Sequence, residues 1–67
     1  MNKEEAIDAV FQGEVIAHPL LEGKVIYLDE DMMRPVIVSR DSYDFDTDPF
    51  QFRHQYIKVT NLKDVIP

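Results

Sequence analysis

The sequence of 67 residues contains no cysteine, no tryptophan and only two glycines. Without cysteine, neither disulfides nor thiolate metal sites can form, so the usual staples of a small domain are missing. A chain of this length buries only ~60% of the surface that its unfolded form exposes. Because 45% of the residues are hydrophobic, we expect one domain over residues 1–67 that gains further burial as a homo-oligomer.

Segments that would direct the chain to a membrane are not recognisable either. The N-terminus, Met1 to Glu5, is polar and acidic and lacks the basic start and apolar stretch of a signal peptide. No apolar run approaches the ~20 residues of a transmembrane helix. We therefore expect a cytoplasmic protein with no membrane partner.

Acidic residues dominate the charge, and the formal net charge is −6. Residues 1–48 contain twelve of the 13 acidic residues, whereas residues 49–67 contain three basic residues against one acid. A chain with this balance lacks the basic face that neutralises phosphates, so we expect no binding to nucleic acid. The three basic residues of the C-terminal segment leave room for one local anion site. A simpler interpretation of the acidic residues is that they only favour solubility.

A helix is predicted over residues 3–12. Asn2 and Glu5 form the pattern of a capping box at its start, and Gly13 suits the left-handed position just past its end. Between them runs an apolar stripe at helical spacing, which consists of Ala6, Ile7, Val10 and Phe11. We expect this stripe, including Phe11, to face the core.

Strand-forming segments follow the helix. Strands are predicted at residues 15–17, 24–28, 35–40 and 50–59. The first ends before Pro19 and is expected at a sheet edge, and the short connections at Gly23 and residues 29–31 fit hairpins. Residues 41–49 lack periodicity and are predicted to be a loop. The fold class is therefore α+β, with an N-terminal helix packed on a small, mostly antiparallel four-stranded sheet.

The last predicted strand changes phase along its length. One face carries Phe50, Phe52, His54 and Tyr56, and the other carries Ile57 and Val59. This pattern predicts either a bulge near Gln55 or a strand that is covered on both faces. The tail at residues 61–67 is expected to dock through Leu62, Val65 and Ile66.

The acidic stretch at residues 41–48 is a candidate cation site. Asp44, Asp46 and Asp48 fit the first three ligand positions of a calcium-binding loop. The glycine and the glutamate that this loop needs further along are absent. The pattern therefore favours a solvated turn with Asx-type hydrogen bonds over a metal site.

The chain shows no recognisable catalytic machinery. His18 and His54 are isolated in the sequence, with no carboxylate at a spacing that indicates a catalytic pair. Such histidines more often form a hydrogen bond with a backbone group than act as acids or bases. The acids at residues 29–31 lie in a predicted hairpin turn, where solvation is the common outcome. We expect a protein that is not an enzyme and that needs no cofactor.

Basic and aromatic residues form the best candidate for a binding site. The set comprises Tyr27, Arg34, Arg40, Arg53, His54 and Tyr56. Guanidinium groups pair with phosphates, and aromatic rings stack on bases. The plainer alternative is arginines on the exposed faces of a sheet and tyrosines half-buried in it. Arg53 and its neighbours are the first residues to test for an anionic ligand.

The N-terminal half also resembles a known family. The order helix, glycine, strand, glycine, strand runs over residues 5–13, 15–23 and 26–28. It is similar to the start of the Thoeris anti-defence family, small phage proteins that sequester nucleotide-derived immune signals as oligomers. That family has tryptophans after the first strand and near its end, so Tyr27 or Tyr56 would have to replace them in stacking on a ligand. The resemblance implies a phage protein that acts in the host cytoplasm.

Two functions follow from these patterns. The first is a homo-oligomeric binding protein that sequesters a phosphorylated nucleotide signal at a basic and aromatic site between subunits, to counter host defence. The second is an acidic inhibitor that occupies a basic groove on a host protein. The first requires at least two of Arg34, Arg40 and Arg53 on one concave surface, whereas the second requires scattered arginines and clustered acids.

Overall fold

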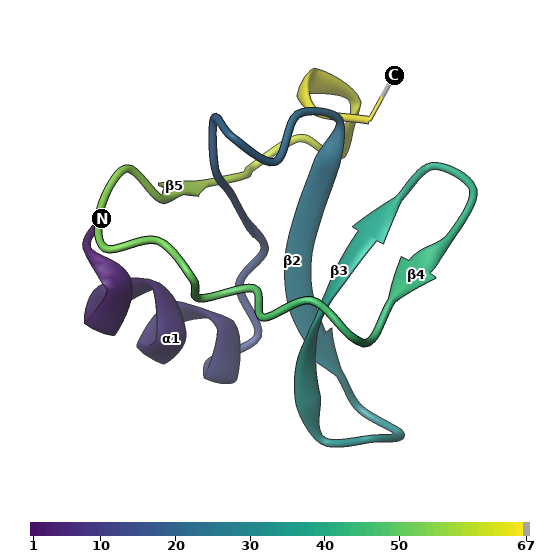
Figure 1. Ribbon diagram of the computed structural model, residues 1–67, viewed down its shortest axis with the longest axis horizontal. Coiled ribbons are helices and arrows are strands. Elements are labelled where there is room, and N and C mark those ends of the chain that lie inside the picture. The colour runs from purple at the N-terminus through teal and green to yellow at the C-terminus, as the bar shows by residue number, and fades with distance from the viewer. Residues whose placement is uncertain (67) are drawn as a thin grey trace.

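The computed structural model describes residues 1–66, in which one helix packs on an antiparallel sheet (Figure 1). Helix α1, Lys3–Phe11, begins at the predicted capping box. The Asn2 side chain accepts a hydrogen bond from the Glu5 amide at 2.8 Å, and the Glu5 carboxylate accepts one from the Asn2 amide at 3.0 Å. Gly13 has a φ of 93°, as expected past the helix end. The predicted helix is confirmed.

The sheet contains five strands in the order β4-β3-β2-β1-β5, and every neighbouring pair is antiparallel. Their bounds are β1 Ile16–Ala17, β2 Lys24–Asp29, β3 Arg34–Ser39, β4 Tyr43–Asp44 and β5 Ile57–Lys58. The α+β class is confirmed. The expectation that the first strand lies at an edge is wrong, because β5 pairs along its free side before Pro19 ends the ladder.

The β2–β3 hairpin is the longest pairing in the sheet, from Lys24 opposite Ser39 to Asp29 opposite Arg34. Pro35 disturbs it little. The Ser39 amide donates to the Ser42 carbonyl at 2.9 Å, on the side of β3 that faces away from β2. Backbone nitrogens two or four residues apart in a strand point to the same side, so the nitrogen of Pro35 also faces away from β2.

Two sequence predictions fail in the C-terminal half. The predicted loop at residues 41–49 contains β4, and the predicted strand at residues 50–59 is irregular except for β5. The phase change is real, but its cause is a left-handed residue: Gln55 has a φ of 74° and lies outside any strand. It turns the chain between an aromatic segment and β5.

The core lies between α1 and one face of the sheet. Its members are Ala6, Ala9, Val10, Ile16, Ile26, Ile37, Phe50 and Tyr56. Phe11 is 54% exposed, so the prediction that it faces the core is wrong. At 100° per residue, Phe11 lies about 140° around the helix from Ala6, and the buried face is too narrow to include it.

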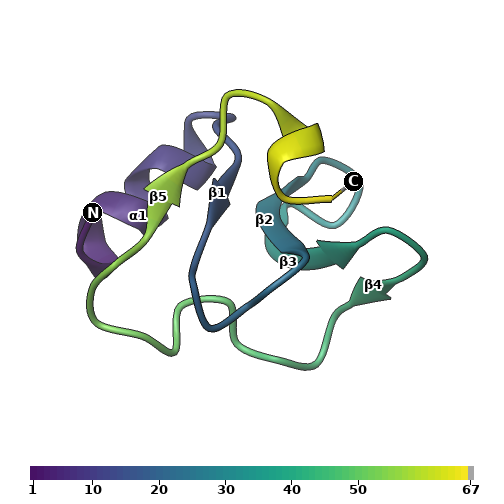
Figure 2. The same cartoon turned by 90° about the horizontal axis from the view of Figure 1, so that it is seen from above.

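The second face of the sheet is partly covered by the chain's own C-terminal segment, which includes the short 3₁₀ helix η1, Leu62–Asp64 (Figure 2). A cavity of about 220 Å³ separates them, lined by Val15, Val25, Tyr27, Val38, Leu62 and Ile66. The predicted docking is confirmed for Leu62 and Ile66, which line this cavity, although Leu62 is 52% exposed; Val65 is half-buried. Pro67 lies outside the described residues.

Within residues 1–66, the structure contains no helix with the length and apolarity that a membrane span requires.

Candidate ligand-binding site

An aromatic row made of Tyr27, Tyr43 and Phe45 lies on the sheet face that is turned away from α1. Tyr27 pairs with Val36 in the register of β2 and β3. Tyr43 pairs with Val38, which lies two residues along β3 on the same face. The ring centroids of Tyr27 and Tyr43 are 6.4 Å apart and those of Tyr43 and Phe45 are 5.9 Å apart, both edge to face.

The outer two rings of this row are open to solvent. Tyr43 is 55% exposed and Phe45 is 43% exposed. Figure 1 shows β4 at one side of the β2–β3 hairpin, away from α1. Tyr43 of β4 and Phe45, which follows the strand, are therefore aromatic side chains that the core does not use.

Two arginines flank the aromatic row. The Arg34 guanidinium lies 5.7 Å from the centroid of the Phe45 ring, and its Nη2 donates to the Phe45 carbonyl at 3.3 Å. Arg40 follows the end of β3 and lines a hollow of about 510 Å³ together with Tyr43 and Phe45. At about 3.3 Å per residue along β3, the two arginine backbones are ~20 Å apart. We call Arg34, Arg40 and the aromatic row the ligand face.

Among the described side chains, no direct ion pair neutralises the positive charges of the ligand face. Among the side chains that the structure describes, the one ion pair joins Lys58 to Glu14 at 2.6 Å. Arg34 and Arg40 are both exposed. Carboxylates are nevertheless near, because Asp29 is the strand partner of Arg34 and Asp41 lines the same hollow as Arg40. The surface is thus mixed in charge, with two guanidinium groups available to an anion.

Tyr27 links the ligand face to the covered part of the sheet. Hydrogen bonding with Tyr43, together with burial and the negative charge of Asp29, raises the pKa of Tyr27 to about 12. Its hydroxyl therefore stays protonated and neutral at physiological pH. Tyr27 can donate a hydrogen bond to a ligand or to Tyr43 without adding negative charge.

Tyr56, by contrast, is a core residue. It is fully buried, its hydroxyl donates to the Pro49 carbonyl at 3.0 Å, and the Phe52 amide donates to that hydroxyl at 3.2 Å. Burial raises the pKa of Tyr56. The side chain holds the irregular segment before β5 in place and does not reach a surface where a ligand could bind.

Arg53 and His54 are exposed but lie near the start of α1, apart from the ligand face. The Lys3 amide donates to the Arg53 carbonyl at 2.9 Å. The His54 carbonyl accepts from the ring of His18. Of the predicted set, Tyr27, Arg34 and Arg40 thus share one sheet face, whereas Arg53, His54 and Tyr56 lie elsewhere. The two arginines lie at opposite ends of β3, and of the two only Arg40 lines the hollow beside Tyr43 and Phe45.

Sequence reasoning missed Tyr43 and Phe45. They are separated by one residue, which is the spacing that places two side chains on the same face of a strand. The acids around them obscured this signal, because the stretch was interpreted only as a loop.

The acidic loop around β4 makes local hydrogen bonds, as its sequence predicted. The Asp44 carboxylate accepts from the amides of Asp46 and Thr47, both at 3.0 Å, and the Asp48 carboxylate accepts from Phe50 at 2.9 Å. Hydrogen bonds from Thr47 and Asp46 lower the pKa of Asp44. Over the described part of the chain, no three His, Cys, Asp or Glu side chains group closely enough to hold a metal ion.

Comparisons of the chain with protein-family models, with curated protein sequences and with solved structures give no match. Function is therefore inferred from the chemistry of the ligand face.

Proposed function

We propose that the chain is a small binding protein that holds a phosphorylated nucleotide on the ligand face without transforming it. The observation that carries this proposal is that Arg34 and Arg40 lie on the same sheet face as the exposed rings of Tyr43 and Phe45, with Arg34 at the Phe45 ring and Arg40 in the hollow that both rings line. Of the two arginines only Arg40 lines that hollow, so the face of one copy is open rather than a single concave surface. In a chain of net charge −6, two guanidinium groups that have no carboxylate ion pair among the described side chains lie near solvent-exposed aromatic rings and favour an anionic, planar ligand.

Each part of such a ligand has a matching group. A base stacks on an exposed aromatic ring with a gain of ~1–3 kcal/mol. A phosphate accepts two parallel hydrogen bonds from a guanidinium group. Because Arg34 and Arg40 lie at opposite ends of β3, the ligand face suits an extended nucleotide with phosphate groups away from its base.

The biological role that we propose is sequestration. A protein that binds a nucleotide signal and does not convert it lowers the free concentration of that signal. The resemblance of the N-terminal half to the Thoeris anti-defence family supports this role, for a phage protein that acts in the host cytoplasm against a nucleotide-dependent defence.

We further propose that the ligand is closed in between two copies of the chain. Small-molecule sites usually bury ~70–90% of a ligand, and the hollow beside Arg40 is a shallow surface on one copy. Asp29 and Asp41 lie beside the arginines of the ligand face, so two copies can meet there without general repulsion. A second copy would also cover Tyr43 and Phe45.

The test is a thermal-shift and calorimetric screen with cyclic and linear nucleotides, with inorganic phosphate as the simple anion. A ligand present at 100 times its Kd stabilises the folded state by ~2.7 kcal/mol. We expect at least one nucleotide to raise the Tm, and we expect Arg34→Glu and Arg40→Glu to weaken its binding at least about tenfold.

Arg53→Glu is the matched control, because it makes the same charge change outside the ligand face. It should bind the nucleotide as the wild type does. The proposal is wrong if no nucleotide stabilises the protein, or if Arg53→Glu weakens binding as much as Arg34→Glu and Arg40→Glu do.

A further inference from the structure

The largest apolar side chain of α1 lies on the outside of the domain. The buried positions of the helix are Ala6, Ala9 and Val10, whereas Phe11 is 54% exposed and Ile7 is half-buried. Small residues thus face the sheet, where they permit close packing, Ile7 packs against the edge of the core with part of its surface exposed, and Phe11 faces solvent. The core does not account for Phe11.

Ile7 and Phe11 are four residues apart and therefore adjacent on the helix surface. Together with Glu4, Glu5 and Asp8 they line a shallow hollow of about 520 Å³. We call these five residues the helix patch. It combines two apolar anchors with three carboxylates on one exposed face, on the side of the sheet opposite the ligand face.

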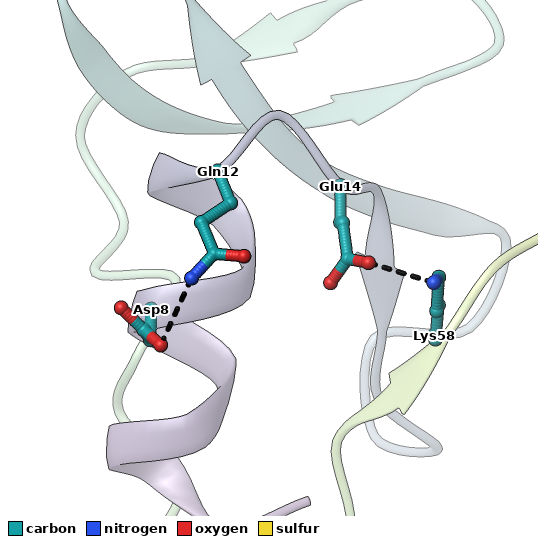
Figure 3. A network of polar contacts seen from close by, with 4 residues as sticks. All are labelled: Asp8, Gln12, Glu14 and Lys58. Carbon is teal, nitrogen blue, oxygen red and sulfur yellow. Dashed lines mark hydrogen bonds and ion pairs between the residues drawn. The ribbon is translucent and has the colours of Figure 1, made fainter.

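The carboxylates of the helix patch have no cationic partner among the described side chains. Figure 3 shows Asp8 with the neutral amide of Gln12, whose nitrogen donates to the carboxylate at 3.2 Å. In the same view Glu14 is paired with Lys58 at 2.6 Å. Glu5 is engaged by the Asn2 amide of the capping box. The negative charge of the helix patch is therefore available to a partner.

A second copy of the chain fits this surface poorly. Two helix patches facing each other would place their like charges around a single apolar contact, which is unfavourable. The C-terminal segment of the chain is also not available, because Ile66 packs on the other face of the sheet. The charge of the helix patch instead complements a basic surface.

We propose that the helix patch docks into an apolar groove rimmed by lysine and arginine on another protein. Ile7 and Phe11 would enter the groove as two anchors one helical turn apart, which is a common mode of helix recognition. The surrounding carboxylates would meet the basic rim and accelerate association at low salt. This surface is independent of nucleotide binding, since no residue belongs to both.

The probe is a synthetic amphipathic peptide with leucines on one helical face and lysines on the other, titrated into the isotope-labelled protein and followed by NMR. We expect shift changes centred on α1 and binding that weakens as salt is added. Phe11→Ala and Asp8→Lys should each weaken binding at least about tenfold, as expected for an anchor and for a reversed charge.

Phe45→Ala is the matched control, since it removes a similarly exposed phenylalanine from the ligand face, and it should bind the peptide as the wild type does. Circular dichroism of every variant separates lost binding from lost folding. Equal peptide affinity of Phe11→Ala and wild type would refute the proposal, as would shift changes centred on the ligand face. Self-association of the wild type that Phe11→Ala abolishes would also overturn it, by assigning the helix patch to a second copy.

Discussion

The imidazole of His18 joins two segments that lie far apart in the sequence, because its Nε2 donates a hydrogen bond to the carbonyl oxygen of His54 at 2.8 Å. The other ring nitrogen, Nδ1, accepts from the Leu20 amide at 3.1 Å. The ring also stacks on Phe52 with centroids 3.9 Å apart. His18 is 4% exposed, and both ring nitrogens are occupied by backbone groups. The structural role that its sequence context favoured is confirmed.

Replacing His18 by phenylalanine should destabilise the fold by ~1–3 kcal/mol. The new ring can keep the stacking on Phe52, but the His54 carbonyl and the Leu20 amide lose their partner in a partly buried place. Urea denaturation measures the change. His54→Ala is the control, because the bond uses only the backbone of His54, and it should unfold like the wild type. Equal stability of His18→Phe would show that water replaces both bonds at no cost.

The two sides of α1 should respond very differently to truncation. Ile26 is fully buried against α1, so Ile26→Ala should reduce the free energy of unfolding by ~2–5 kcal/mol. Phe11→Ala removes a larger but exposed side chain and should change it by less than about 1 kcal/mol. Denaturation of both variants at one temperature tests this. A loss of several kcal/mol for Phe11→Ala would place that ring in the core after all.

Local signals in the sequence predicted the N-terminal half of the fold. Asn2 and Glu5 act through a capping box that needs no distant partner, and Gly13 and Gly23 both adopt the positive φ that turns require. The alternating pattern of β2 and β3 gave their hairpin within about one residue at each end. Where neighbouring residues determine the geometry, the sequence was sufficient.

The predictions that failed in the C-terminal half depend on contacts between residues that are far apart in the sequence. Phe52 and Tyr56 pointed to a strand by their spacing, but they instead pack around His18 in an irregular segment. The spacing of Tyr43 and Phe45 was compatible with a strand, but it did not indicate that Tyr43 would pair with Val38 and contact Tyr27. The candidate site was therefore half predicted: Arg34, Arg40 and Tyr27 were among the expected residues, and the exposed rings between them were not.

The phenol of Tyr27 should titrate well above an ordinary tyrosine. Its pKa rises from 10.0 to about 12 in the folded state, chiefly through Tyr43 and also through burial and Asp29. These surroundings therefore contribute stability that is fully present below about pH 10 and is lost as the pH rises through 12. Tyr43→Phe should move the pKa of Tyr27 down towards 10.0. Ultraviolet titration of tyrosinate in the wild type and in Tyr43→Phe measures both values. An unchanged titration curve for Tyr27 in this variant would assign the shift to burial rather than to Tyr43.

Assembly of the chain should depend on the ligand face. We expect a dimer or larger species at micromolar concentration, since the small core leaves Tyr43 and Phe45 exposed and a second copy would cover them. Sedimentation velocity should show this species in the wild type and a monomer in the double variant Tyr43→Ser with Phe45→Ser. Nucleotide binding should shift the equilibrium further towards the larger species, because a ligand held between copies stabilises their contact.

Phe11→Ala, which changes the opposite surface, should sediment as the wild type does. A monomer that binds its nucleotide with one-to-one stoichiometry at every concentration would remove the shared site and leave the ligand face of a single copy as the whole binding surface.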